Sequence, residues 1–351
     1  MRKLLLTLLL PVVVLAACGS DDSAPNTAAA TTTTAATTTS SGADTPASAA
    51  PSSSPAAFPV TVKGQLGDAT IATAPQRVLP LTPADLDTVV GLGVEPIAIP
   101  TNDSGQVVDF PWLSGKLPAG APSLDVNAAN GLPVEQIAAL KPDVIVANGY
   151  WDLETYYAQL SAIAPVVHYV NGQNADTWQA TTTTIATALG RAAQGDALIA
   201  ETERVITDAA TAHPDLAGKT FDLVIARDAA TVSIMRSEQD AMGRNVAALG
   251  LKLSDFARSV PGDDLKVPLS VEQLGNLNPD VLFVIGPSGI GDVLAADPIW
   301  SSLPVMQRGA TVVLTRGAPD ALALGFPTAL NLQWLTGEIV PKIEAALSTG
   351  G

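Results

Sequence analysis

The chain has 351 residues, of which 47% are hydrophobic and 15% charged, and its formal net charge is −16. This length suffices for a large core and for more than one domain. A surface this acidic repels nucleic-acid phosphates and no basic stripe interrupts it, so the composition argues against nucleic-acid binding.

The N-terminus, MRKLLLTLLLPVVVLAAC, has the pattern of an export signal. Arg2 and Lys3 precede an apolar run at 4–16, which is shorter than a membrane-spanning helix. The letters LAAC before Gly19 resemble a bacterial lipobox, so residues 1–17 are predicted to be a signal peptide and Cys18 the lipidated residue. The alternative is a plain signal with an incidental cysteine. As Cys18 is the only cysteine, the exported fold has no internal disulfide.

Residues 18–57 are predicted to form a tether behind the lipidated cysteine. Thr, Ser, Ala and Pro dominate this stretch, as in AAATTTTAATTTSS, and such a composition cannot bury an apolar face. The protein is therefore expected to be exported and lipid-anchored to the outer face of the cytoplasmic membrane, with its function carried by later residues.

Strand and helix patterns alternate through residues 58–193. Short buried strands are expected at 77–81, 94–100, 143–147 and 165–170, with helical patterns between them. Residues 215–351 repeat this plan, with strands expected at 219–228, 280–286 and 310–315. Such alternation predicts an α/β fold with mainly parallel sheets.

A long helix is predicted between these two stretches, at 194–214. Its apolar residues favour one side, Pro214 marks its end, and twenty helical residues span about 30 Å. We therefore expect an N-terminal lobe at 58–193, an interlobe helix at 194–214 and a C-terminal lobe at 215–351.

One phrase occurs in both halves of the chain. PVEQIAALKPDVIV begins at Pro133 and SVEQLGNLNPDVLFV begins at Ser270, so the two copies are offset by 137 positions. Each copy predicts a short helix, a proline stop and a buried strand. The repeat predicts two lobes of the same architecture. The alternative is that two unrelated segments share the common pattern of helix, proline and strand by convergence.

These phrases, together with RVLPLTPADLDTVVGLGVEPIAI and DPIWSSLPVMQRGATVVL, carry a family resemblance over about residues 60–345. The chain resembles the substrate-binding proteins of ABC importers for ferric siderophores, haem and cobalamin. The resemblance implies two α/β lobes joined by one long helix, with the ligand held in the cleft between them. It also implies that Glu135 and Glu272, one in each copy of the phrase, dock into Arg-rich pockets of the paired permease subunits. The alternative role for these glutamates is to favour the dipole of a helix start.

Ligands of open parallel sheets bind beyond the C-terminal ends of the strands, so residues that follow the expected strands are candidates for ligand binding. Tyr150 and Trp151 offer an adjacent aromatic pair. Three arginines that follow strands of the second half, Arg227, Arg236 and Arg316, offer partners for carboxylate, catecholate or propionate oxygens. The full set of candidates is Thr82, Asn102, Asp103, Tyr150, Trp151, Trp178, Arg227, Arg236, Ser288 and Arg316.

No metal or catalytic constellation is predicted. The two histidines, His168 and His213, lack the spacing of a zinc site. If the cargo is haem, Tyr150 is a better candidate than His168 for the axial ligand of its iron. The glycine-rich GPSGIGD at 286–292 has Ile290 where a nucleophile elbow needs glycine and Ser288 where a dinucleotide fingerprint needs one, so an enzyme is not expected.

The sequence therefore predicts a monomeric binding protein, without an intrinsic cofactor, that captures a ferric siderophore and delivers it to an ABC permease. Haem is the second candidate cargo and cobalamin the third. A different class also stays open, namely an envelope scaffold factor derived from such a transport protein.

Overall fold

The computed structural model describes residues 57–101, 110–127 and 131–349. By its contacts the chain divides into two units, 1–52 and 53–351, and every described residue belongs to the second. The predicted signal peptide, Cys18, nearly all of the tether, and the candidates Asn102 and Asp103 lie outside the described residues.

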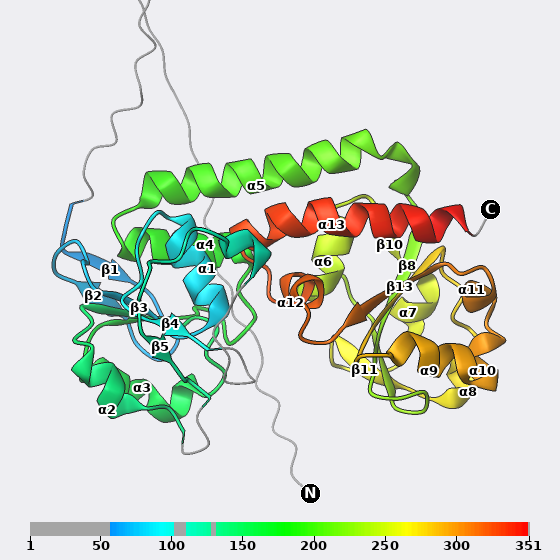
Figure 1. The fold of residues 1–351 in the computed structure, drawn as a ribbon, viewed down its shortest axis with the longest axis horizontal. Helices are drawn as coiled ribbons and strands as arrows, with labels where there is room; N and C mark the ends of the chain where they lie inside the picture. The colour runs from blue at the N-terminus through cyan, green and yellow to red at the C-terminus, as the bar shows by residue number, and fades with distance from the viewer. Residues whose placement is uncertain (1–56, 102–109, 128–130, 350–351) are drawn as a thin grey trace, which may run out of the picture. The chain divides into compact units, whose positions relative to one another are not determined.

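The N-terminal half holds small sheets and their covering helices (Figure 1). Strands β3, β6 and β7 form a parallel sheet in that order, β4 pairs with β5 in parallel, and β1 pairs with β2 antiparallel. The elements are β1 (Val60–Val62), β2 (Ala69–Ile71), β3 (Val78–Pro80), α1 (Pro83–Gly91), β4 (Ile99–Pro100), η1 (Pro111–Leu113), β5 (Ser123–Leu124), α2 (Val134–Ala139), β6 (Val144–Val146), α3 (Leu153–Ser161), β7 (Val166–Val167) and α4 (Trp178–Ala188).

Helix α1 begins and ends at residues whose types suit those positions. The Thr82 hydroxyl caps its start by accepting from the backbone N–H of Asp85, and Pro83 occupies the first helical position. Gly93, with φ of +73°, ends it in the left-handed conformation that glycine adopts without strain. The helix thus carries Asp85 and Asp87 from the end of β3 into the interior.

Helix α5 (Ala192–Ala212) joins the two halves, within two residues of the predicted interlobe helix. It packs along α4 and along the C-terminal helix (Figure 1). The remaining elements are η2 (Pro214–Leu216), β8 (Thr220–Ala226), β9 (Val232–Met235), α6 (Ala241–Ala247), β10 (Lys252–Leu253), α7 (Asp255–Ser259), β11 (Lys266–Leu269), α8 (Val271–Leu274), β12 (Val281–Gly286), α9 (Ile290–Ala296), α10 (Pro298–Ser301), α11 (Pro304–Gln307), β13 (Thr311–Thr315), α12 (Pro319–Gly325) and α13 (Ala329–Ser348).

The second half is built on a six-stranded sheet with the order β11-β9-β8-β12-β13, and β10 pairs with β8. Strands β8, β10, β12 and β13 run parallel, whereas β9 and β11 are antiparallel to their neighbours. The predicted fold class, two α/β lobes with mainly parallel sheets and one long joining helix, is confirmed.

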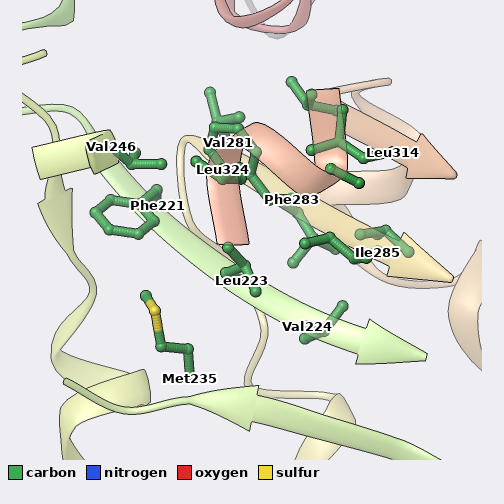
Figure 2. Packing of buried hydrophobic residues seen from close by; sticks show 14 of the residues in the cluster. Phe221, Leu223, Val224, Met235, Val246, Val281, Phe283, Ile285, Leu314 and Leu324 are labelled. Atoms are coloured by element: carbon green, nitrogen blue, oxygen red, sulfur yellow. The ribbon is translucent and has the colours of Figure 1, made fainter. Parts of the chain in front are cut away.

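The core of the second half lies on the faces of β8 and β12. Figure 2 shows Phe221 and Leu223 of β8 beside Phe283 and Ile285 of β12, with Leu324 of α12 close by. All four strand residues are at least 96% buried. Trp300 of α10 is fully buried as well, and its indole N–H donates to the Ala229 carbonyl at 2.8 Å. Central strands buried on both faces explain the continuous apolar runs in the sequence.

The C-terminal helix α13 contacts both halves, which the sequence analysis did not anticipate. It packs on α1 and α4 of the first half and on β12 and β13 of the second. Leu330, in its first turn, lies against Gly91 of α1 together with Leu198 of α5, and an added Cβ on Gly91 would come within 3.2 Å of both leucines. Two long helices therefore tie the halves together, and only α5 does so as a chain crossing.

The repeated phrase has a structural role in its proline-aspartate portion. Asp143 accepts from the backbone N–H groups of Gln76 and Arg77 at 2.8 and 3.0 Å, just before β3. Asp280 accepts from the N–H and hydroxyl of Thr220, at the start of β8. In both halves the aspartate thus fixes the entry of the neighbouring strand, which confirms that the two copies are the same unit of architecture.

Candidate functional site

A cavity of about 590 Å³ opens between the two halves, within the size range of small-molecule sites. Most residues of the first half that line it follow β3, β5, β6 or β7 or lie in α4, as expected for the C-terminal ends of parallel strands, and Phe110 and Trp112 add to the lining from η1. Residues of the second half come from α6, α12, the start of α13 and, at Gly317, the loop after β13. The lining residues are Thr82, Pro83, Ala84, Asp85, Asp87, Thr88, Phe110, Trp112, Val126, Asn127, Asn148, Gly149, Tyr150, Trp151, Gln173, Asn174, Asp176, Trp178, Thr181, Ala241, Arg244, Gly317, Leu322, Gly325, Phe326, Pro327, Thr328 and Asn331.

Asp85 organises the wall where β3 and β6 end. Its Oδ2 accepts from the Thr82 hydroxyl at 2.7 Å, and its Oδ1 accepts from the backbone N–H groups of Asn148 and Gly149 at 3.0 and 3.4 Å. Burial raises the pKa of Asp85 to about 7, although these hydrogen bonds act to lower it. The carboxyl therefore holds the loop after β6 against the start of α1.

At Gly149 the backbone of the loop after β6 passes close to the Thr82 side chain. A Cβ added to it would lie 2.9 Å from the Thr82 hydroxyl oxygen. Glycine at this position lets the loop after β6 pass close to Thr82, and it places Tyr150 and Trp151 at the cavity.

Asp87 lies two residues after Asp85 in α1, and its side chain contacts the second half. Its Oδ2 accepts from the hydroxyl of Thr328 at 3.0 Å, and the Asn331 amide lies at 3.5 Å, both at the start of α13. Burial raises the pKa of Asp87 to about 7, and the adjacent Trp112 indole opposes this shift. Yet neither Oδ1 of Asp87 nor Nε1 of Trp112 reaches a partner with hydrogen-bond geometry.

Aromatic side chains gather around the cavity. Phe110 stacks on Trp112 with ring centroids 4.6 Å apart, and both are buried. Tyr150 is buried and donates its hydroxyl to the Val126 carbonyl at 3.3 Å. In contrast, Trp151 is 68% exposed and Phe326 is 54% exposed, so two large apolar rings stand in solvent at the cavity. Exposed aromatic surface of this kind is typical of a binding site.

The second half contributes one charged side chain to the lining. Arg244 of α6 is half-buried, and its Nη1 donates to the Gln239 carbonyl at 2.5 Å. Within the described part of the chain it forms no ion pair, so its remaining N–H groups are available to a ligand.

The structure brings together part of the predicted set. Thr82, Tyr150, Trp151 and Trp178 all line the cavity. The second-half candidates do not: Arg227, Arg236, Ser288 and Arg316 are absent from the lining. Arg227, Ser288 and Arg316 are exposed elsewhere, and Arg236 is half-buried with its Nε unpaired. Ligand contact by any of these residues stays a prediction.

Asp85 follows the expected strand at 77–81 but is not in the predicted set, and Asp87, Arg244 and the Phe326–Asn331 segment were not indicated as site residues at all. A signal existed for the two aspartates. Thr82 and Asp85 have the spacing of a helix start, and Asp87 lies three positions before Val90, on the apolar stripe of α1. A carboxylate on an apolar stripe must find a buried partner, which the sequence does not identify.

Metal or haem ligation is not favoured by the titratable groups here. No cluster of three potential metal ligands occurs among the described residues. Both nitrogens of His168 are engaged, since Leu66 N–H donates to Nε2 and Nδ1 faces the Val166 carbonyl. Burial raises the pKa of Tyr150 to about 12, which opposes the phenolate that an axial iron ligand requires.

Glu135 and Glu272 lie in the first turns of α2 and α8 and are both exposed. Neither makes a side-chain hydrogen bond or ion pair with another described residue. In Figure 1, α2 and α8 lie on the side away from α5. The side chains of the two glutamates of the repeated phrase thus contact no other described side chain, in contrast to its aspartates, and their place in a first helical turn also fits the helix-dipole alternative.

Comparison with known proteins places this architecture. The family model described as periplasmic binding protein matches residues 81–316, which is most of the described chain. The chain belongs to this family. Among the described residues, no helix combines the length and apolarity needed to cross a membrane.

Two curated relatives are described as proteins that bind ferric citrate or a siderophore. The chain is 29% identical over 249 residues to the Fe(3+)-citrate-binding protein YfmC of Bacillus subtilis, covering 69% of this chain and 74% of that protein. It is 30% identical over 165 residues to YfiY of the same organism, described as a probable siderophore-binding lipoprotein, over 47% of this chain and 49% of YfiY.

Solved structures share the fold. PiaA of Streptococcus pneumoniae TIGR4 in complex with ferrichrome is 24% identical, covers 83% of this chain and all of its own, and superposes with a TM-score of 0.71. A periplasmic solute binding protein from Mycobacterium smegmatis is 28% identical, with coverage of 82% and 98% and a TM-score of 0.68. These likenesses confirm the two-lobed fold predicted from the sequence.

Proposed function

We propose that this protein captures a ferric siderophore outside the cytoplasm and delivers it to an ABC permease. The observation that carries this proposal is the cavity of about 590 Å³, which is lined by both halves and bordered by the exposed rings of Trp151 and Phe326. A ferric siderophore is large enough to cover such rings. Its iron arrives already chelated, so the protein needs no metal ligand of its own, and its action is binding rather than catalysis. Family membership and the iron-uptake relatives support the same cargo.

Intrinsic fluorescence tests the capture of cargo. Three of the five tryptophans, Trp112, Trp151 and Trp178, line the cavity. A ferric siderophore bound there absorbs near-ultraviolet light and should quench the emission in a saturable way. The matched control is the iron-free siderophore, which should quench far less. If no ferric siderophore, haem or cobalamin changes the emission, the capture proposal is wrong and the envelope scaffold alternative is favoured.

Lipid anchoring at Cys18 completes the proposed arrangement. Lipoproteins occur among the relatives, as the description of YfiY states. Two or more acyl chains hold a protein stably on a membrane, because each buried methylene contributes about 0.8 kcal/mol. In our proposal the monomeric binding protein thus stays near its permease on the outer face of the membrane.

Replacing Cys18 with alanine should move the protein from the membrane fraction to the soluble fraction. The measurement is an immunoblot of fractionated cells, with Ser20→Ala as the matched control. The control should stay with the membrane. Membrane retention of the Cys18→Ala variant would contradict the proposed anchor.

Delivery is proposed to use Glu135 and Glu272. Each is exposed at a helix start and is not engaged within the described chain. A carboxylate in this position can form a bidentate, charge-assisted pair with an arginine of a partner. One such acid in each half suits a permease built from two related subunits.

A further inference from the structure

The charge of the cavity wall restricts what the cavity can hold. Its ionisable lining residues are three acids, Asp85, Asp87 and Asp176, and one base, Arg244, apart from the Tyr150 phenol. The two internal stretches outside the described residues, 102–109 and 128–130, contain no lysine or arginine. The nearby Lys116 directs its ammonium to the Trp112 carbonyl at 2.6 Å and is not part of the lining. Arg244 is therefore the only cation of the described wall.

The acids differ in how far their oxygens are satisfied. Both oxygens of Asp176 accept hydrogen bonds, from the backbone N–H of Val170 and from the backbone and amide of Asn171. Asp85 is held by Thr82 and by two backbone N–H groups. Asp87, which is 99% buried, keeps Oδ1 without a partner. The wall thus holds one buried carboxylate oxygen, Oδ1 of Asp87, that no described group satisfies.

An anionic cargo would find little compensating charge in this wall, because Arg244 is its only cation. Taking a multiply charged anion out of water is costly unless cations compensate it, and here a single arginine would have to compensate the whole charge. The aromatic rings of the cavity do not discriminate between anionic and neutral cargo, because an aromatic face can cover apolar surface of either.

Siderophore classes differ in net charge. Three hydroxamates, each of which loses one proton, neutralise Fe³⁺ and leave a complex without net charge. Three catecholates lose two protons each and give a trianion, and hydroxycarboxylate complexes such as ferric citrate are also anionic. A neutral complex still offers oxygen acceptors to the guanidinium of Arg244 and to the indole N–H groups of Trp151 and Trp178.

We propose that the cavity selects an electrically neutral ferric tris-hydroxamate and rejects ferric catecholates and ferric citrate. This inference rests on the proposed function and narrows its substrate class. It separates this chain from its relative YfmC, whose description names ferric citrate. The observations that carry it are the single cation of the described wall, Arg244, which forms no ion pair there, and the unsatisfied Oδ1 of the buried Asp87.

Binding of three probes tests the inference: ferrichrome as the neutral hydroxamate, ferric enterobactin as the catecholate, and ferric citrate. Ferrichrome should bind at least about 100-fold more tightly than either anionic probe, and its affinity should change little between low and high salt. If an anionic complex binds as tightly as ferrichrome, the class inference is wrong while the capture function stands. If none of the three binds, the proposed function itself fails.

Variants of the wall give an independent test. Gln173 is exposed and lines the cavity, so Gln173→Lys adds a cation and Gln173→Met adds a neutral side chain of similar size. The ratio of the affinity for ferric enterobactin to the affinity for ferrichrome should be about 10-fold higher in the lysine variant than in the methionine variant. An equal change for both probes would show that charge does not govern selection, and it would overturn the inference.

Discussion

Iron uptake should fall to the background level when Glu135 and Glu272 are both replaced with alanine, while the affinity for cargo stays within about two-fold of the wild type. Each glutamate lies in an exposed first helical turn and contacts no other described side chain. Removing them therefore costs the isolated protein little. In the proposed complex each removal leaves a permease arginine buried without a partner, which costs on the order of 2 kcal/mol or more per site.

The measurement is accumulation of radioactive iron by cells in which the gene carries the variants, paired with fluorescence titration of the purified proteins. Glu338→Ala is the matched control, because Glu338 is also an exposed helical glutamate, in α13. That variant should transport normally. Normal uptake by the double variant would exclude the docking role, and a loss of cargo affinity would place the two glutamates in the binding site instead.

The repeated phrase illustrates what a sequence alone can and cannot assign. Its recurrence predicted two halves of one architecture, and the structure confirms this because Asp143 and Asp280 fix the same strand entries. The residues alone did not show that the aspartates make internal hydrogen bonds and the glutamates do not. Both are acidic residues in identical registers, and only the contacts separate the internal role from the exposed one.

The strands and the long helix were predictable because they follow short-range patterns. Buried runs, proline stops and the uninterrupted stretch at 194–214 reappear as β8, β12 and α5. The second-half side of the cavity was not predictable in this way. The rule that ligands bind beyond strand ends selected Arg227 and Arg316, yet beyond β13 it is Gly317 that lines the cavity, and the rest of the wall there is formed by α6, α12 and the start of α13. Helix packing across the halves is a long-range property that local spacing does not encode.

The contact between Asp87 and the start of α13 couples the cavity wall to the stability of the fold. The hydroxyl of Thr328 and the amide of Asn331 meet one carboxylate oxygen, and the N-terminus of a helix favours negative charge. These interactions do not fully offset burial, since the pKa of Asp87 is raised to about 7 from 3.8. The charged form is therefore less stable in the folded protein than in the unfolded chain.

The sign of the resulting pH dependence follows from this shift. The folded state binds a proton at Asp87 more tightly than the unfolded state does, so its contribution to stability is complete below about pH 4. That contribution is lost as the pH rises through about 7, and the shift from 3.8 corresponds to at most about 4 kcal/mol. Asp85, with a pKa raised to about 7 by burial, acts in the same direction.

Asp87→Asn should remove the Asp87 part of this dependence. Asparagine resembles the protonated acid in charge, so the variant should gain stability relative to the wild type between about pH 5 and about pH 8, by roughly 2 to 4 kcal/mol. Any misfit of the new amide beside Trp112 shifts the variant equally at every pH, because the indole does not titrate. The change in the variant's relative stability between the two pH values therefore reports the effect of the Asp87 charge alone.

Urea unfolding of both proteins at the two pH values measures this difference, with the exposed Asp263→Asn as the control. The control should follow the wild type. A difference between Asp87→Asn and the wild type that does not change with pH would mean that the carboxyl is fully stabilised as an anion by Thr328, Asn331 and the helix start. In that case the burial of Asp87 would impose no electrostatic cost on the fold.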